Sequence, residues 1–262
     1  MALRANTGTS VVFKRFQDNI KRQDWFSVGL EILAVVFGVF LALQADNWNQ
    51  WRLERSEERD YLVRLYADIN SSIDTARGAI DYMNLHADRA NVVLRSLKAC
   101  RIDQDDQLDF ANGLFQLGNV LQPYLADGTI NELRATGKES VFRAANIRQG
   151  LNQLLAERRY YMSFFNIVAD RLAPHVVYVH SQVSFQIDRS NAGSQEIRWE
   201  DLQVDLNLLC DDARFFNAVS AGRTYSYDTV FWSNLELERL EHFLETLQVE
   251  MDRLGLSPQD PG

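Results

Sequence analysis

The chain contains few of the residues that interrupt regular structure. Its 262 residues include only four prolines and thirteen glycines. Sandwiches and barrels need frequent turns, which these residues form most often, so their scarcity disfavours both folds. Hydrophobic residues make up 46% of the sequence, which is enough to bury a sizeable core. The composition favours an all-α protein.

Motifs of catalysis and metal binding are also missing. The sequence has no Gly-rich phosphate loop, no Gly-x-Ser-x-Gly, no Cys-x-x-Cys and no His-Glu-x-x-His. His175 and His180 would lie about 140° apart on a helix, which does not suit one metal site. The acidic run from Asp103 to Asp109 lacks the glycine and the terminal glutamate of a calcium loop. We therefore expect no enzyme activity and no cofactor.

Positive charge is scarce outside the N-terminal part. Residues 1–45 hold five Lys and Arg against three Asp and Glu, whereas residues 46–262 hold 22 against 33. Proteins bind nucleic acid through clustered Lys and Arg that displace counterions. The acidic excess, a net of −11 over residues 46–262, therefore argues against a nucleic-acid partner.

One long apolar run is present, and it extends from Trp25 to Ala45. Its 21 residues would span roughly 31 Å as a helix, about the thickness of a bilayer's hydrocarbon core. Trp25 stands at one end, and Trp48 and Trp51 follow the other, as amphipathic rings do at membrane interfaces. We predict a transmembrane signal anchor over 25–45. The alternative, a signal peptide cleaved near Ala45, normally has a shorter apolar region.

Charge on the two sides of this run predicts its orientation. Five basic residues precede it and four arginines follow it before residue 65, which favours a cytoplasmic N-terminus. In a bacterium, the protein would then lie in the inner membrane with its main domain in the periplasm. Residues 1–24 would form a cytosolic basic segment, either an interfacial amphipathic helix over 11–22 or a disordered tail.

Only two cysteines occur, Cys100 and Cys210. An oxidising compartment permits one disulfide between them. Two unrelated buried thiols are the alternative, because free cysteine packs as a small hydrophobe. The sequence leaves both interpretations open.

A heptad pattern follows the apolar run, from Leu62 to Leu97. Apolar residues recur there at alternating steps of four and three, with no proline and only Gly78 inside. We expect the membrane helix to continue through this segment, with Asp46–Asn49 as the place for any break. The seam would be buried in an intramolecular bundle or in a homo-oligomeric coiled coil, and further long helices favour the bundle.

Further helices are predicted over 108–121, 130–136, 145–188 and 211–254. Thr129 and Glu132 have the spacing of a capping box, and Pro174 predicts a kink or a short break. Asp211 or Asp212 would cap the last helix. Glycines at 137 and 255 suit left-handed helix ends. We expect a loop over 189–200, a disordered tail over 257–262, and an elongated antiparallel bundle over 46–256.

Glu31 is the one ionisable residue of the apolar run. A charge at the centre of a membrane helix costs on the order of 2.5–3.5 kcal/mol. Small residues share its helix face and would let a second helix approach closely. The predicted helix-packing face consists of Ser27, Glu31, Ala34, Gly38, Ala42 and Ala45. Its partner would be a second copy or another membrane protein; alternatively, Glu31 reaches back to the cytosolic interface.

An aromatic group lies within the last predicted helix: Tyr225, Tyr227, Phe231 and Trp232. We expect it in the core of the bundle. Aromatic clusters between helices can also line a ligand pocket, which is the alternative.

Two stretches resemble an uncharacterised family of bacterial single-pass membrane proteins. The first has Leu30-Glu31-Ile32, Gly38-Val39, Ala42-Leu43-Gln44 and the junction Asn47-Trp48-Asn49, followed by the pair Tyr61-Leu62. The second has Thr129-x-x-Glu132-Leu133, Ala135-Thr136-Gly137, Ile147-Arg148 and Tyr160-Tyr161. Leu30 stands where the family pattern has Gly. The resemblance implies an anchored helical domain without a known activity.

These features predict a membrane-anchored helical scaffold or interaction protein of the bacterial envelope. A single-pass sensory module, which would bind a small ligand in its bundle, is the alternative.

Overall fold

The computed structural model describes residues 25–186 and 196–257, and their side chains from Gly29 onward. This part of the chain forms six α-helices, two short 3-10 helices and two strands of two residues each. The all-α prediction is confirmed. The basic segment predicted for 1–24 and nearly all of the predicted tail lie outside the described residues.

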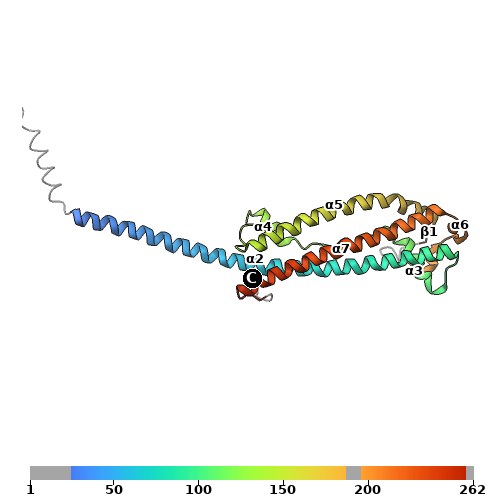
Figure 1. The fold of residues 1–262 in the computed structure, drawn as a ribbon, viewed down its shortest axis with the longest axis horizontal. Coiled ribbons are helices and arrows are strands. Elements are labelled where there is room, and N and C mark those ends of the chain that lie inside the picture. Colours follow the sequence, from blue (N-terminus) through green and yellow to red (C-terminus); the bar gives the residue numbers. More distant parts are fainter. Residues whose placement is uncertain (1–24, 187–195, 258–262) are drawn as a thin grey trace, which may run out of the picture. The chain divides into compact units, whose positions relative to one another are not determined.

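The first helix, α2, extends from Trp25 to Ala99 without interruption (Figure 1). It therefore passes through Asp46–Asn49, and the apolar run and the heptad seam belong to one helix, as predicted. The chain divides into two compact units, Met1–Glu57 and Glu58–Gly262. Bundle packing accordingly begins at Glu58.

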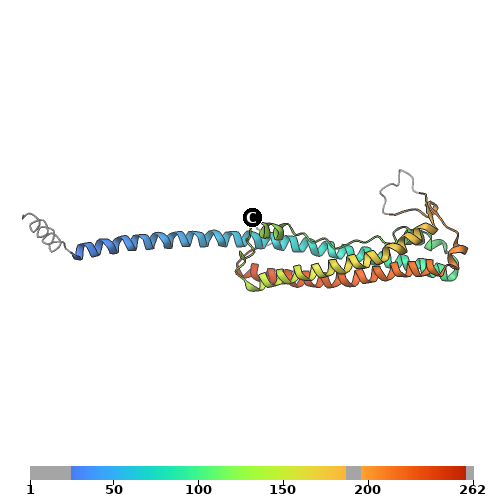
Figure 2. The ribbon, with the colours of Figure 1, turned by 90° about the horizontal axis from the view of Figure 1, so that it is seen from above.

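Three long helices form the second unit: α2 from Glu58 onward, α5 (Ala145–Gln182) and α7 (Ala213–Arg253). They lie side by side in both views (Figures 1 and 2). One end of the core contains Leu62, Ile147 and Leu240, and the other end contains Leu94, Val179 and Phe215. Thus α2 and α5 run in the same direction and only α7 is antiparallel to them, which corrects the fully antiparallel arrangement expected.

The heptad seam is buried inside this bundle. Leu62, Ile69, Met83 and Ala87 have no exposed surface. The intramolecular bundle, and not a coiled coil between copies, therefore covers the seam.

The connection from α2 to α5 leads the chain back along the bundle, so the two helices can run in the same direction. After α2 the chain passes through a 3-10 turn, η1 (Gln104–Asp106), and through α3 (Gln107–Phe115). It then runs in an extended form to α4 (Gly128–Ala135), which precedes α5. Gly118, with a φ of 91°, lies in the turn that ends the predicted 108–121 helix early. Residues 116–127 thus return the chain along the bundle.

The predicted capping box at Thr129 is wrong. The helix begins at Gly128, two residues earlier than predicted, and its N-cap residue Asp127 makes no capping hydrogen bond through its side chain. The Thr129 N–H donates to Asp68 Oδ2 at 2.9 Å, and Glu132 contacts Tyr61 and Arg64 of α2. Contacts with another helix replace the local cap at this position.

The predicted helix ends are better placed. Gly137 and Gly255 have φ values of 67° and 66°, and both follow helix ends as expected. Asp212 caps α7 by accepting from the N–H groups of Arg214 and Phe215. In α5, Pro174 lies inside a helix that continues to Gln182, so no break occurs there.

Small elements between α5 and α7 were not predicted. Strand β1 (Ser184–Phe185) pairs antiparallel with β2 (Leu202–Gln203). The 3-10 helix η2 (Trp199–Asp201) and the helix α6 (Leu206–Cys210) lie in the same region. Most of the loop predicted for 189–200 falls outside the described residues.

Candidate functional site

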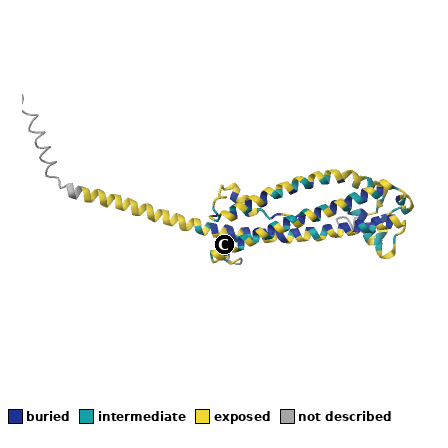
Figure 3. Cartoon of the chain, viewed as in Figure 1, coloured by how far each residue is buried: buried dark blue, intermediate teal, exposed yellow. Residues whose placement is uncertain are grey.

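The apolar part of α2 has no cover within the described chain. Every residue from Gly29 to Glu54 is exposed, and this part of the helix is coloured accordingly in Figure 3. An 18-residue window here has a mean hydropathy of 1.8 and is 0% buried, so this helix is long and apolar enough to cross a membrane. The finding is compatible with a single-pass membrane protein.

The predicted helix-packing face lies in this segment. Glu31, Ala34, Gly38, Ala42 and Ala45 are all exposed, whereas the Ser27 side chain lies outside the described residues. A Cβ added to Gly38 would meet no atom of the described residues within 4 Å. Nothing in the described part of the chain therefore covers this face.

Trp48 and Trp51 follow the apolar run as exposed side chains. Arg52 lies over the Trp48 ring at 5.9 Å, and Arg55 lies over the Trp51 ring at 5.7 Å. Paired aromatic and cationic groups of this kind favour the headgroup region of a membrane. Trp25, the other predicted anchor, starts α2, and its side chain lies outside the described residues.

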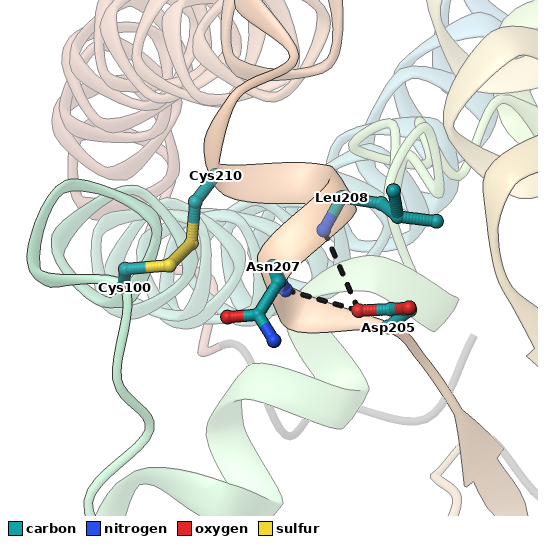
Figure 4. Close-up of a disulfide and its surroundings, with 5 residues drawn as sticks. All are labelled: Cys100, Asp205, Asn207, Leu208 and Cys210. Carbon is teal, nitrogen blue, oxygen red and sulfur yellow. Dashed lines mark hydrogen bonds between the residues drawn. A yellow bond between two sulfur atoms is a disulfide. The ribbon is translucent and has the colours of Figure 1, made fainter.

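Cys100 and Cys210 form a disulfide with a Cα–Cα distance of 5.6 Å. The sequence left open whether the two cysteines are bonded or are separate buried thiols, and in the structure they are bonded. Figure 4 shows the bond next to α6. Asp205 caps the N-terminus of α6, because its carboxylate accepts hydrogen bonds from the N–H groups of Asn207 and Leu208. The disulfide thus ties the end of α2 to the short helix before α7.

Arg89 is a buried cation in the last third of α2. Its guanidinium donates to Gln116 Oε1 at 2.6 Å, to Glu196 Oε1 at 2.5 Å and to Asp109 Oδ1 at 3.3 Å. A buried charge needs such partners because water cannot reach it. Arg89 therefore joins α2 to α3 and to the segment that precedes η2.

His86 lies one turn before Arg89 and is 7% exposed. Burial and the neighbouring Arg89 lower the pKa of His86 to about 4. Its Nε2 has no hydrogen-bond partner within the described chain, and neither has the buried hydroxyl of Tyr225. Both residues line a cavity of about 10 Å³, a size that suits a single water molecule.

The two stretches that carry the family resemblance meet at α4. Tyr61 donates from its hydroxyl to Glu132 Oε1 at 2.9 Å, and Arg64 is ion-paired with the same carboxylate. The Arg64 guanidinium and the Tyr61 hydroxyl hold the pKa of Glu132 below its usual value. Close by in the sequence, buried Glu58 accepts from the Arg143 N–H at 2.6 Å. The sequence analysis did not predict these contacts. The charged residues Glu58 and Arg64, which flank the heptad seam, were the signal that could have indicated them.

The predicted aromatic core is only partly buried. Tyr225 is 4% exposed, as expected, but Tyr227 and Phe231 are 46% and 59% exposed and Trp232 is half-buried. The core prediction is therefore wrong for Tyr227 and Phe231. Tyr227 instead accepts a hydrogen bond from Asn91 at 2.8 Å.

A cavity of about 350 Å³ lies between α5 and α7, beside this aromatic group. Val168, Leu172 and Tyr225 give it an apolar wall. Arg171 and Asp228 are its charged lining residues. Its size falls in the range of small-ligand sites.

Acidic and histidine residues form no metal centre in the part of the chain that is described. In the acidic run, Asp103, Asp106 and Asp109 form ion pairs with arginines, so their charges are already balanced. His180 Nε2 lies 2.9 Å from the Leu114 carbonyl oxygen, a structural contact.

Comparison of the chain with family models, with curated proteins and with solved structures gives no match.

Proposed function

We propose that this chain is a single-pass protein of the bacterial inner membrane that acts as a scaffold or interaction partner, without catalytic activity. One observation carries the proposal. Along a single helix, α2, the residues from Gly29 to Glu54 are exposed, whereas those of the seam from Leu62 onward are buried or half-buried. An exposed apolar surface of this length is unfavourable in water, and lipid is the solvent that suits it.

The disulfide supports a location for the bundle outside the cytoplasm. Disulfides persist in oxidising compartments and are rare where thiols are kept reduced. The excess of basic residues before the apolar run supports the same orientation, with the N-terminus in the cytoplasm and the bundle in the periplasm.

Interaction with a partner helix would use the face around Glu31 and Gly38. The face is free of contacts within the described chain, and its small side chains permit close helix packing. The partner would be a second copy or another membrane protein. The resemblance to single-pass bacterial proteins agrees with this assignment.

A reporter fused after Gly262 tests the orientation. We expect an enzyme that is active only in the periplasm to be active in this fusion. Activity of a cytoplasm-only reporter would contradict the proposal.

The packing face is tested by Gly38→Leu and Glu31→Leu in the detergent-extracted protein. Both should weaken co-purification with a tagged copy or a membrane partner, because the larger or apolar side chains remove the close approach and the polar contact. Gly29→Leu is a matched control, since residue 29 lies about 160° from residue 31 around the helix. Unchanged assembly in both variants would rule out this face.

A sensory role is the second candidate, and the cavity of about 350 Å³ between α5 and α7 favours it. A ligand bound there should raise the melting temperature of the protein. A panel of metabolites that gives no shift would count against sensing.

A further inference from the structure

Trp232 of α7 lies at the centre of an exposed aromatic cluster. Its ring centroid is 5.0 Å from that of Phe164, 5.6 Å from Phe231 and 6.0 Å from Tyr160. Tyr160 is 65% exposed and Phe231 is 59% exposed, although both rings contact other aromatic rings. We call these four residues the aromatic face. Contiguous aromatic surface of this kind is typical of protein interfaces.

The aromatic face continues along α5. Residues 160, 164, 167 and 171 follow the spacing that places side chains on one side of a helix. Ile167, which is 50% exposed, extends the apolar stripe by a turn, and Arg171 follows it. The stripe therefore ends in a positive charge.

A negative charge lies at the corresponding place on α7. Asp228 and Arg171 line the same cavity between the two helices, so they are at the same level of the bundle. Within the described chain, no ion pair joins them to each other or to another residue. Each helix thus presents an unbalanced charge, of opposite sign, beside the aromatic face.

This arrangement is self-complementary. We propose that two copies of the chain associate through their aromatic faces about a two-fold axis parallel to the helices. In such a contact, α5 of one copy lies across from α7 of the other, and residues at the same level meet. Arg171 of each copy then pairs with Asp228 of the other, and the aromatic rings fill the centre.

The two-fold axis has a further consequence. It keeps the N-terminal ends of both bundles on the same side, as two chains anchored in one membrane require. Confinement in a membrane also raises the effective concentration of the copies, so a modest face is sufficient for association. The inference rests on the proposed interaction role, but it uses a surface separate from the Gly38 face.

Energy transfer between two labelled populations of the full-length protein in liposomes tests the inference. R171D and D228R should each weaken self-association by about tenfold or more, because each replaces two attractive pairs by two repulsive ones. An equal mixture of R171D and D228R chains should restore association to within about threefold of the natural protein, because the attractive pairs form again. F231S should also weaken association, and its exposed position spares the fold.

Two variants serve as charge-matched controls. R159D changes the same charge on α5, but residue 159 lies about 100° from Tyr160 around the helix. D81R matches D228R and lies on the exposed side of α2. Both should associate as the natural protein does.

If energy transfer in the natural protein is no greater than random proximity would give, the inference is overturned. It is also overturned if the mixture of R171D and D228R chains does not restore association. Association that Gly38→Leu abolishes and R171D leaves intact would overturn it while supporting the proposed membrane face. If R171D still associates, and an added amino acid releases the natural protein but not R171D, the charges belong to a ligand site, which would also overturn it.

Discussion

At the scale of single residues, Cys100 occupies a backbone position that normally belongs to glycine. Its φ is 48°, in the left-handed region, and the N–H of Arg101 bonds to the Ser96 carbonyl as in a glycine-terminated helix end. A side chain with a Cβ costs about 1 kcal/mol or more in this conformation. The disulfide gives a reason for cysteine at this position.

We predict that glycine is the better residue at position 100 once the disulfide is absent. In a C210S background, C100G should be more stable than C100A by about 1 kcal/mol, because glycine adopts a positive φ without strain. Thermal unfolding of the two double variants in detergent measures the difference. Equal stability, or greater stability of C100A, would contradict the assigned backbone conformation.

His86 should make the fold sensitive to acid. Its folded pKa of about 4 lies below the usual value of 6.5, so the unfolded chain takes up a proton first as the pH falls. Stability should therefore drop between roughly pH 6.5 and pH 4, by about 2 to 3 kcal/mol. Tyr82, Arg89 and Tyr225, which surround the ring, offer no carboxylate to offset the charge.

Denaturant unfolding at about pH 7 and about pH 4.5 measures this effect. His86→Gln should lose most of the difference between the two pH values, whereas His175→Gln, at an exposed position, should keep it. The same pH dependence in all three proteins would show that other groups cause it.

At the scale of elements, the sequence predicts those features that depend on neighbouring residues. The long helices, the Asp212 cap and the glycine ends at 137 and 255 all follow from local patterns. The capping box predicted at Thr129 does not form, because Asp68, 61 residues earlier in the chain, accepts the hydrogen bond that a local cap would make. The short pair β1 and β2 escapes prediction because two residues carry too little periodicity.

Two glycines inside helices should respond to alanine in opposite ways. A Cβ at Gly113 of α3 would lie 2.8 Å from the Arg89 carbonyl oxygen of α2, so Gly113→Ala should destabilise the fold by about 1 to 3 kcal/mol. At exposed Gly78 nothing lies within 4 Å, and Gly78→Ala should stabilise α2 by up to about 1 kcal/mol. Melting temperatures that shift in the same direction for both would refute the packing of α3 on α2.

At the scale of the whole molecule, composition predicts the fold class but not the order of the helices. Apolar periodicity reports which face of a helix is buried and says nothing of its direction. The parallel pair α2 and α5 depends on the return of residues 116–127, an irregular stretch without a pattern. The exposed aromatic face was missed for a related reason, because a burial pattern cannot distinguish a core aromatic from one that meets a partner.

In the candidate site too, features set by local composition are predictable from the sequence, and features set by the packing of distant segments are not. The apolar run and its small-residue face are readable from the sequence because a bilayer imposes a length and a composition. The contacts of Arg89, and the position of Arg171 and Asp228 beside one cavity, are not readable in this way, because they depend on which helices become neighbours.

Extraction of isolated membranes with alkaline carbonate tests the membrane anchor most directly. This treatment strips proteins that adhere to the surface and leaves those that span the bilayer. We predict that the intact full-length chain stays in the membrane pellet. Its recovery in the supernatant, with the N-terminal segment still attached, would contradict the account.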